Sequence, residues 1–294
     1  MAAGLRLAIR RPTKPALPII PQCQSRSIDE LFSFGKELGR GSYGVVRMAR
    51  PKAEAAELFT SKGFKPPTHV AIKTIIARDS DEVEDLAREI AIMSHLSFEH
   101  SLQYYGCFQQ DKTIHIVMEY FEGRELFDLT AIPVSATQVL QILYKIALAV
   151  QELHDHNIIH RDLKLENVMI GPDETIKLID YGSACDLGRD SCGSGEHGSP
   201  EYSDPVEDSS LIQQEWWAFG QLAATLILRE RLYQERTGSF RAMPGPKGLG
   251  SELPARVYLM ISRLVDPKLS LKLRPTPAKI LSTLKRAVDT STSP

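Results

Sequence analysis

The sequence predicts an α+β protein whose strands lie in its first half and whose helices dominate its second half. In the first half, residues 113–120 form an apolar, strand-like run, and the glycine-rich residues 39–44 are followed at once by β-branched Val45 and Val46. In the second half, apolar residues recur at helical spacing over 135–154. A chain of 294 residues can bury a substantial core, either as one large domain or as two moderate lobes.

Composition and charge exclude several classes of protein. The chain is 43% hydrophobic and 24% charged, as soluble globular proteins are, and its formal charge of −2 gives no general attraction to nucleic acid or anionic lipid. No apolar run approaches the roughly 20 residues that span a bilayer. We therefore expect no nucleic-acid partner and no membrane span, and the oligomeric state stays open. The four cysteines are too few for a disulfide framework, so we expect reduced thiols, with Cys185 and Cys192 exposed and inert.

The first 27 residues differ in character from the rest of the chain. They carry five basic residues and no acid, and prolines at 12, 15, 18 and 21 forbid a continuous helix. An acid-free start that contains arginine is typical of an organelle transit peptide, whereas the prolines favour a disordered tail. We expect residues 1–27 to be a disordered basic tail of an intracellular, cytoplasmic protein, with organelle targeting as the alternative.

A glycine-rich loop joins two predicted strands near the start of the chain. Gly39, Gly41 and Gly44 follow an aromatic-rich, strand-like stretch. Glycine allows the backbone to approach phosphate groups closely, because it has no Cβ atom. A dinucleotide-binding turn would open a helix after the glycines, but Val45 and Val46 favour a strand. The sequence therefore predicts a loop between two strands that can cover phosphates.

A lysine and a glutamate in the first half are candidates for an ion pair. Residues 70–73 form a short strand that ends in Lys73, and 81–96 has helical spacing with Glu89 inside it. A lysine at a strand end is usually solvated, but one that follows a glycine loop can bind phosphates and needs an anion to orient it. The long connection at 50–68 is predicted to be a surface insertion with one helical turn.

The segment 160–167 carries the most chemical information in the chain. It reads His-Arg-Asp-Leu-Lys-Leu-Glu-Asn, and so places the carboxylate of Asp162, the ammonium of Lys164 and the amide of Asn167 on one loop. These groups suit proton transfer from a hydroxyl, neutralisation of a phosphoryl group and metal binding. Thirteen residues after Asn167, Asp180 ends an apolar run, so that a strand delivers a second carboxylate.

Taken in order, these segments resemble the eukaryotic-type protein kinase superfamily. The resemblance covers about residues 28–288, and a lysine two residues after Asp162 is typical of the serine/threonine-specific branch. It implies a bilobal fold with a small β-rich N-lobe that contains one key helix and a larger, mainly helical C-lobe. The implied limits are 28–118 for the N-lobe, 119–123 for the hinge, 124–288 for the C-lobe and 289–294 for a polar tail.

The resemblance also implies roles for the residues near 160–167. Asp162 would orient the substrate hydroxyl and accept its proton, and Lys164 would stabilise the transferring phosphoryl group. Asn167 and Asp180 would bind Mg²⁺, for which Mn²⁺ can substitute. Ser199, in a stretch that resembles the peptide-positioning element of serine/threonine kinases, would contact Asp162 and Lys164.

The implied ATP site lies between the two lobes, under the glycine loop. Lys73, oriented by Glu89, would bind the α- and β-phosphates. The other residues of the implied site are Gly39, Gly41, Ser42, Tyr43, Gly44, Val46, Ala71, Met169, the gatekeeper Met118, the adenine-binding backbone of Glu119 and Phe121, and the ribose-contacting Glu125.

Residues 182–206 form a Gly/Ser-rich loop that the resemblance identifies as an activation loop. Arg161 places a cation beside Asp162 and near this loop, and kinases with such an arginine are often switched on by a phosphate in the loop. Ser194 is the best-placed phosphate acceptor and Ser191 the second. The alternative is that these serines only solvate the loop.

Three departures from the family pattern concern the scaffold and leave the reacting groups intact. Tyr181 replaces a phenylalanine and should still pack against the helix that carries Glu89, and Glu215 replaces an aspartate that anchors the catalytic loop. Val206 replaces a glutamate whose partner arginine corresponds to Arg274. Because an unpaired buried arginine would cost several kcal/mol, we expect another acid to substitute. The candidates are Asp204 and Glu207.

The sequence therefore predicts a serine/threonine protein kinase that transfers the γ-phosphoryl group of ATP to protein substrates with Mg²⁺ and is regulated through its activation loop. Glu166, together with Glu125, favours basic residues near the phosphoacceptor. One alternative is a pseudokinase that acts as a binding or scaffolding module, which the three departures motivate and the intact set of reacting groups opposes. The other is a kinase of small molecules, which the peptide-positioning stretch at 198–202 opposes.

Overall fold

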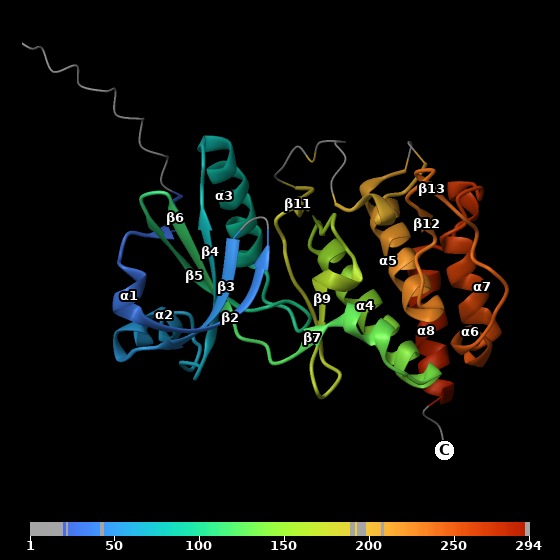
Figure 1. Cartoon of the computed structure of the whole chain (residues 1–294), viewed down its shortest axis with the longest axis horizontal. Helices are drawn as coiled ribbons and strands as arrows, with labels where there is room; N and C mark the ends of the chain where they lie inside the picture. Colours follow the sequence, from blue (N-terminus) through green and yellow to red (C-terminus); the bar gives the residue numbers. More distant parts are fainter. Residues whose placement is uncertain are drawn as a thin grey trace, which may run out of the picture.

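The computed structural model describes residues 20–21, 23–41, 44–188, 192, 198–206 and 209–291. Its strands gather mainly at one end of the molecule and its long helices at the other, with α3 standing beside the strands (Figure 1). Several predicted features lie outside the described residues. They are the tail at 1–19, Ser42 and Tyr43 of the glycine loop, the serines Ser191 and Ser194, and Glu207.

A six-stranded sheet forms the N-terminal lobe, with the order β1-β5-β6-β4-β3-β2. Its neighbouring strands are antiparallel, except that β1 runs parallel to β5. The β2–β3 hairpin contains the glycine loop, so the prediction that the glycines join two strands is confirmed. The strands are β1 (Cys23–Gln24), β2 (Phe32–Gly41), β3 (Gly44–Pro51), β4 (Val70–Ile76), β5 (Tyr104–Gln110) and β6 (Thr113–Glu119).

Each face of this sheet is covered by a different group of apolar side chains. Helix α3 (Ser80–His95), capped by Asp79, buries Val83, Leu86 and Ile90 against one face. The opposite face carries a second cluster that includes α1 (Ile28–Leu31). Because the two faces bury different segments, the sheet is held in place on both sides.

The 50–68 connection contributes to that second cluster. It contains the 3-10 turn η1 (Ala53–Ala55) and helix α2 (Ala56–Thr60), which confirms the predicted helical turn. Phe59 is fully buried, and its ring meets Tyr105 edge-on at 5.0 Å between centroids. The connection is therefore part of the core of the lobe, and its description as a surface insertion was incomplete because it overlooked the burial of this phenylalanine.

The described residues before position 28 also belong to the sheet. Ile20 is buried and its N–H donates to Gln109 Oε1 at 2.7 Å, while Cys23 and Gln24 pair with Cys107 and Phe108 as strand β1. The sequence placed the start of the folded lobe at residue 28. The difference arises because prolines suppress a helix but do not prevent a short strand at a sheet edge.

The C-terminal lobe is built around helix α5 (Leu211–Leu228), which is buried on nearly all sides. This helix begins at Leu211, where Ser210 and Gln213 form a capping box. Helix α8 continues through Ser291, so the predicted tail at 289–294 is helical in its first residues. The other helices are α4 (Ala136–Asp155), α6 (Leu249–Glu252), α7 (Ala255–Leu264) and α8 (Pro277–Ser291).

Short strands and 3-10 turns connect the two lobes and carry the loops of the candidate site. Strands β7 (Arg124–Glu125), β9 (Val168–Ile170) and β10 (Ile176–Leu178) form one small sheet. The remaining short elements are β8 (Ile158–Ile159), β11 (Cys185–Asp186), β12 (Tyr233–Gln234), β13 (Ser239–Phe240), η2 (Leu126–Ala131), η3 (Leu165–Asn167), η4 (Pro200–Tyr202) and η5 (Leu271–Leu273).

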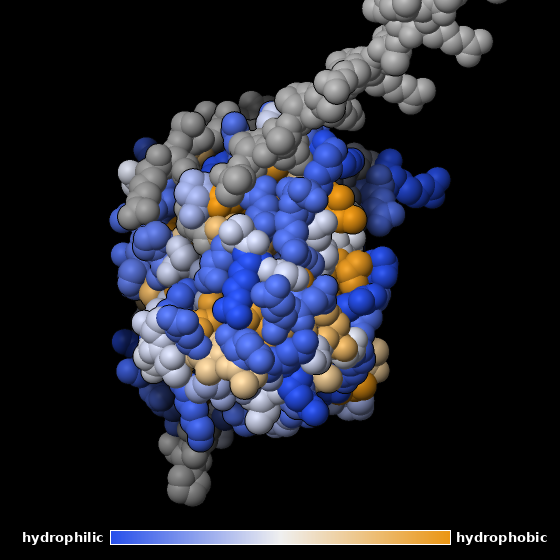
Figure 2. All heavy atoms as spheres, turned by 90° about the vertical axis from the view of Figure 1, so that its left-hand side faces the viewer, coloured by the Kyte–Doolittle hydropathy of each residue, from blue (hydrophilic) through white to orange (hydrophobic). Residues whose placement is uncertain are grey.

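One end of the molecule can be judged by its surface polarity. The end of the molecule formed by the N-terminal lobe is mostly hydrophilic, with hydrophobic residues in small separate groups (Figure 2). Within the described residues, no helix has the length and apolar character needed to cross a bilayer.

Candidate active site

The loop after β8 gathers a carboxylate, an ammonium group, an amide and a hydroxyl. Lys164 Nζ lies 2.8 Å from Asp162 Oδ2 and donates to Ser199 Oγ at 3.2 Å. Asn167 Nδ2 donates to both the main-chain oxygen and Oδ2 of Asp162, each at 2.8 Å. The structure therefore brings Asp162, Lys164, Asn167 and Ser199 together as the sequence predicted.

The second carboxylate oxygen of Asp162 is in a different situation. Asp162 Oδ1 is buried and accepts no hydrogen bond from the described residues. A buried carboxylate oxygen without a donor is costly, so such an oxygen is suited to receive a hydrogen bond from a bound hydroxyl. Gly198 borders it, with φ of 81°, and a Cβ atom there would come within 2.6 Å of Arg161 O and 3.2 Å of Asp162 Oδ1. Glycine at 198 keeps this space open.

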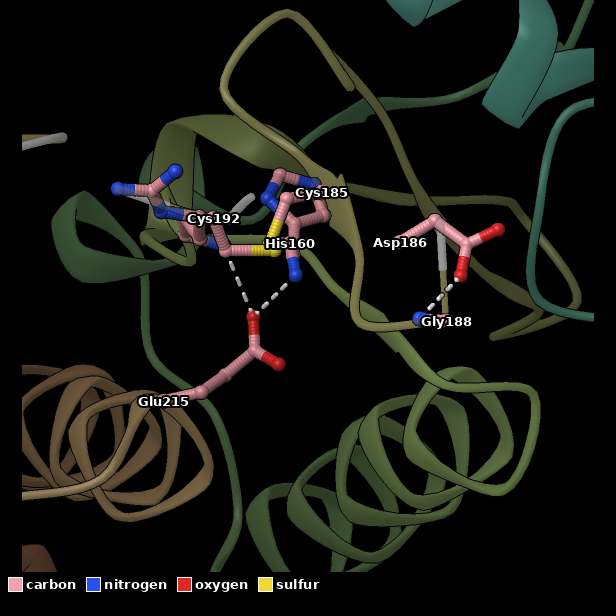
Figure 3. Close-up of a disulfide and its surroundings, with 7 residues drawn as sticks. His160, Cys185, Asp186, Gly188, Cys192 and Glu215 are labelled. Atoms are coloured by element: carbon pink, nitrogen blue, oxygen red, sulfur yellow. Dashed lines mark hydrogen bonds between the residues drawn. A yellow bond between two sulfur atoms is a disulfide. The ribbon is translucent and has the colours of Figure 1, made fainter. Parts of the chain in front are cut away.

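Glu215 of α5 holds the backbone of the loop at 160–167, the catalytic loop of the family pattern. Its Oε1 accepts hydrogen bonds from the backbone N–H groups of His160 at 2.7 Å and Arg161 at 3.1 Å, and its Oε2 lies 2.5 Å from His154 Nε2. Figure 3 shows the carboxylate directed at this backbone segment. Arg161 has a positive φ of 65°, a strained conformation that these two bonds help to hold. The glutamate therefore performs the anchoring expected of an aspartate.

Three charged residues meet on the N-terminal side of the site. Lys73 Nζ on β4 lies 2.6 Å from Glu89 Oε1 on α3 and 3.6 Å from Asp180 Oδ1. Burial alone would lower the pKa of Lys73, but the negative charges of Glu89 and Asp180 outweigh it and raise the pKa above its ordinary value. Lys73 is thus a fixed cation, and the predicted pairing with Glu89 is present in the structure.

Asn167 and Asp180 are the residues that could hold a metal ion. They are adjacent, because the N–H of Ile179 donates to Asn167 O at 3.0 Å. The Asn167 nitrogen is bound to Asp162, which leaves its amide oxygen as a ligand, and the Asp180 side chain is 41% exposed. No cluster of three His, Cys, Asp or Glu side chains is found in the described ranges. Two oxygen ligands fit Mg²⁺, which commonly takes one or two protein ligands plus phosphates and water.

Several residues of the predicted nucleotide site lie on neighbouring strands. Ala71 and Met118 are buried opposite each other on β4 and β6, and Val46 pairs with Lys73 across β3 and β4. The Glu119 N–H donates to Gln103 O at 2.8 Å. The Phe121 N–H donates to no acceptor in the described part of the chain. Met169 on β9 and Glu125 on β7 are register partners nearby.

The glycine loop also takes the expected form where it is described. Gly41 pairs with Gly44 across the hairpin, and Gly39 pairs with Val46. Gly44 has φ of 141°, and a Cβ atom there would come within 2.3 Å of Thr74 O. Only glycine fits at this position, because the β4 backbone approaches so closely.

Comparison with known proteins decides the family. The protein kinase domain family matches residues 32–243, which include the glycine loop, Lys73, Asp162 and Asp180.

The chain belongs to the protein kinase family.

It lies in the serine/threonine branch of the eukaryotic superfamily, and the predicted family and α+β bilobal fold are confirmed. The chain is 30% identical to Aurora kinase of Saccharomyces cerevisiae, over 74% of this chain and 58% of that protein. It is 32% identical to Aurora/IPL1-related protein kinase 2 of Caenorhabditis elegans (67% and 63%) and to NUAK family SNF1-like kinase 1 of Homo sapiens (67% and 29%). The chain thus spans less than two thirds of the length of these relatives.

Tyr181 of this kinase occupies its position without disturbing the site. Its side chain is 2% exposed, its ring lies 5.0 Å from that of His160 between centroids, and Met93 of α3 belongs to the same core. Its hydroxyl donates to Leu178 O at 3.5 Å. Burial raises the pKa of Tyr181, so the phenol stays neutral. The predicted contact with His160 is present, and the packing toward the helix that carries Glu89 stays a prediction.

Asp204 is the acid that pairs with Arg274. The two side chains form hydrogen bonds of 2.6 and 3.1 Å and are 0% and 6% exposed, respectively. The guanidinium of Arg274 also lies over the ring of Trp217 at 4.5 Å. Of the two candidates that the sequence offered, Asp204 is in place, and Glu207 lies outside the described residues. The loss of a glutamate at Val206 is therefore compensated.

The cysteines differ from the expectation of four reduced thiols. Cys185 and Cys192 form a disulfide, and Cys23 and Cys107 are free. Cys185 is 4% exposed, because β11 pairs with β8 and places it opposite Ile159, next to the loop that Glu215 anchors (Figure 3). The expectation that Cys185 is an exposed, inert thiol was wrong, since spacing alone does not show which cysteines a fold brings together.

Sequence reasoning also missed Arg231, which binds two acids beside the catalytic loop. Its guanidinium contacts Glu166 and Glu201. No periodic pattern marks it, because its partners are 65 and 30 residues away in the chain.

Proposed function

We propose that this chain is an active serine/threonine protein kinase that transfers the γ-phosphoryl group of ATP to protein hydroxyls with Mg²⁺. The observation that supports it most strongly is that the carboxylate oxygen Oδ1 of Asp162 is buried and accepts no hydrogen bond from the described residues. Lys164 and Asn167 hold the other oxygen of the same carboxylate, so Oδ1 keeps a fixed direction. A carboxylate prepared in this way can orient a hydroxyl and take its proton.

The transfer itself needs little covalent chemistry from the protein. The substrate hydroxyl donates to Asp162 Oδ1, and its oxygen forms a bond to the γ-phosphorus while the bond to the β–γ bridging oxygen breaks and ADP leaves. The hydroxyl proton passes to Asp162. Lys164 lies 2.8 Å from that carboxylate and can offset charge on the transferring group. Ser199 holds Lys164 on the substrate side.

On the nucleotide side, Lys73 would bind the α- and β-phosphates, because Glu89 fixes its position at 2.6 Å. Asn167 and Asp180 would hold Mg²⁺, which would neutralise phosphate charge when bound. Met118, Glu119, Phe121 and the residues opposite them would receive the adenine, and Glu125 the ribose.

Regulation through the activation loop is part of this proposal. Burial lowers the pKa of Arg161, and the positive charge of Arg88 on α3 lowers it further. A phosphate on the loop would add an anion that guanidinium groups bind with charge-assisted hydrogen bonds. The candidate acceptors Ser194 and Ser191 lie outside the described residues.

The alternative, a pseudokinase used as a binding module, rested on the three departures. Each departure keeps its structural contact: Tyr181 packs on His160, Glu215 binds the catalytic loop and Asp204 pairs with Arg274. These contacts favour the enzyme over the binding module.

A peptide library tests the proposal. Purified protein with Mg²⁺ and labelled ATP is offered degenerate peptides with Ser, Thr or Tyr as the acceptor, beside the Lys73→Met variant. Transfer to Ser and Thr that the variant loses by about a hundredfold or more is expected. Intact binding of Mg²⁺-ATP without transfer, both before and after treatment with activating kinases, would overturn the proposal in favour of the binding module.

A further inference from the structure

Two acidic side chains flank the place where a substrate hydroxyl would meet Asp162. Glu166 lies on η3, two residues past Lys164, and Glu201 lies on η4, two residues past Ser199. Lys164 and Ser199 are hydrogen bonded to each other at 3.2 Å, so the two acids border the same part of the site. A peptide whose hydroxyl reaches Asp162 must pass close to this acidic pair.

The acidic pair is already occupied by Arg231. Its Nη2 lies 2.9 Å from Glu166 Oε1 and its Nη1 lies 2.8 Å from Glu201 Oε1. One guanidinium therefore bridges two carboxylates with charge-assisted hydrogen bonds. The acids are 29% and 20% exposed and the arginine 36%, so the bridge is screened less than an ion pair on the open surface.

The backbone keeps Arg231 in this position. It follows the end of α5, where Arg229 adopts a left-handed conformation with φ of 62° and its N–H donates to Thr225 O at 2.9 Å. The next residue, Leu232, is fully buried, and its carbonyl accepts from the N–H of Arg241 at 3.1 Å. With anchors on both sides, the guanidinium occupies the acidic pair at little further cost in conformational entropy.

Within the described part of the chain, the nearby acids Glu125 and Asp128 form no ion pair of this kind. Burial raises the pKa of Glu125, and the negative charges of Asp128 and Glu166 raise it further, so these three carboxylates lie within reach of one another. Arg231 contacts Glu166 alone among them. The outer part of the acidic surface, at Glu125 and Asp128, thus remains available to a cation from outside, whereas in the inner part Arg231 already binds Oε1 of each acid.

We propose that Arg231 is a specificity-determining residue that occupies the Glu166–Glu201 subsite from within the chain. A basic substrate residue that reaches Glu125 and Asp128 then raises kcat/KM. A second basic residue that would reach Glu166 and Glu201 does not raise it. The inference rests on the proposed kinase activity. It revises the sequence-based expectation that Glu166 itself favours a basic substrate residue. A substrate arginine would have to displace a guanidinium that is already bound, anchored and covalently part of the enzyme.

Arginine-scanned peptides test this assignment. One serine peptide carries a single arginine at the position that the enzyme prefers, and a second set adds one more arginine at every other flanking position. The kcat/KM of each peptide is measured for wild type, Arg231→Ala and Arg231→Lys. Arg241→Ala is a matched control, because Arg241 is also 36% exposed and its side chain pairs with Glu230, which is not part of the acidic pair.

In wild type and Arg241→Ala, no second arginine should raise kcat/KM more than about twofold. In Arg231→Ala, one position should show a gain of about tenfold, since a charged hydrogen-bond pair becomes available to the substrate. Arg231→Lys should give a smaller gain in kcat/KM, because the lysine ammonium group can still bind one of the two carboxylates. Thermal melting of each variant shows that the comparison is made between folded proteins.

Two outcomes would overturn the inference: an equal gain from the second arginine in wild type, or no gain at any position in both Arg231 variants. If wild type transfers no phosphate, the same comparison is made by binding of fluorescent peptides in which alanine replaces the acceptor serine. A tenfold gain in affinity only in Arg231→Ala then supports the subsite although the proposed function has failed. Equal affinities in wild type and Arg231→Ala would reject it.

Discussion

Asp204 and Arg274, separated by 70 residues in the chain, form a two-point ion pair in the interior of the C-terminal lobe. Removal of the acid would leave a guanidinium that is 6% exposed without its charged partner. We expect Asp204→Ala to lower the free energy of unfolding by about 3–5 kcal/mol. Denaturant unfolding measures this loss.

The double variant Asp204→Ala/Arg274→Met is the control for this pair. It removes the uncompensated charge together with the acid, so it should be more stable than Asp204→Ala alone. The single variant Arg274→Met is measured as well. If the losses in the free energy of unfolding of the two single variants simply add up in the double variant, the two side chains do not stabilise each other.

The charge of Lys73 predicts how ATP binding depends on pH. In wild type the charges of Glu89 and Asp180 raise the pKa of Lys73 above its ordinary value of 10.5. Lys73 therefore stays protonated up to about pH 10, and loss of its charge should not weaken ATP binding below that pH. In Glu89→Gln, burial acts against fewer neighbouring charges and the pKa falls. The affinity of this variant should therefore begin to decline at a lower pH than that of wild type.

Titration of fluorescent ATP binding between pH 7 and 10 measures both profiles, at values chosen around the ordinary lysine pKa. Glu84→Gln is the control, since Glu84 is an exposed acid on the same helix. The same profile for Glu89→Gln and Glu84→Gln would refute the account of the Lys73 charge.

The disulfide predicts a labelling pattern for the four cysteines. Protein denatured without reductant should react with iodoacetamide at Cys23 and Cys107 and not at Cys185 and Cys192. After reduction, all four should react. Peptide mass spectrometry distinguishes the sites. Labelling of Cys185 in carefully non-reduced protein would contradict the bond.

The burial of Phe59 indicates that the 50–68 connection contributes to the stability of the fold and not to catalysis. The side chain is fully buried in the cluster on the sheet face opposite α3, so Phe59→Ala should lower the free energy of unfolding by about 3–5 kcal/mol. The kcat of the folded variant should match wild type. Glu57→Ala, on the same helix and exposed, should change stability by less than about 0.5 kcal/mol. Equal effects of the two substitutions would mean that the helix does not pack as described.

The residues of the candidate site were predictable because each belongs to a short, ordered motif. The Lys73–Glu89 pair and the contacts among Asp162, Lys164, Asn167 and Ser199 follow from spacing within or between such motifs. Strands and helices with clear periodicity, such as β6 and α4, were predicted close to their observed limits.

Features that depend on long-range contacts were not predictable in the same way. The sequence named two acids as partners for Arg274, and only the fold shows Asp204 in contact with it. The Cys185–Cys192 bond, the burial of Phe59 and the bridge from Arg231 to Glu166 each depend on where distant segments meet. No local sequence pattern indicates these long-range contacts, because burial and pairing depend on the whole fold.

The proposed mechanism requires Asp162 to accept the proton of a protein hydroxyl during transfer from ATP. A single-turnover assay with γ-labelled ATP and a preferred serine peptide measures this step most directly, in wild type and in Asp162→Asn, with Mg²⁺-ATP affinity measured in parallel. We predict that the rate of transfer falls by about a hundredfold or more in the variant while ATP affinity stays within about twofold. Equal rates of transfer in both proteins would contradict the account.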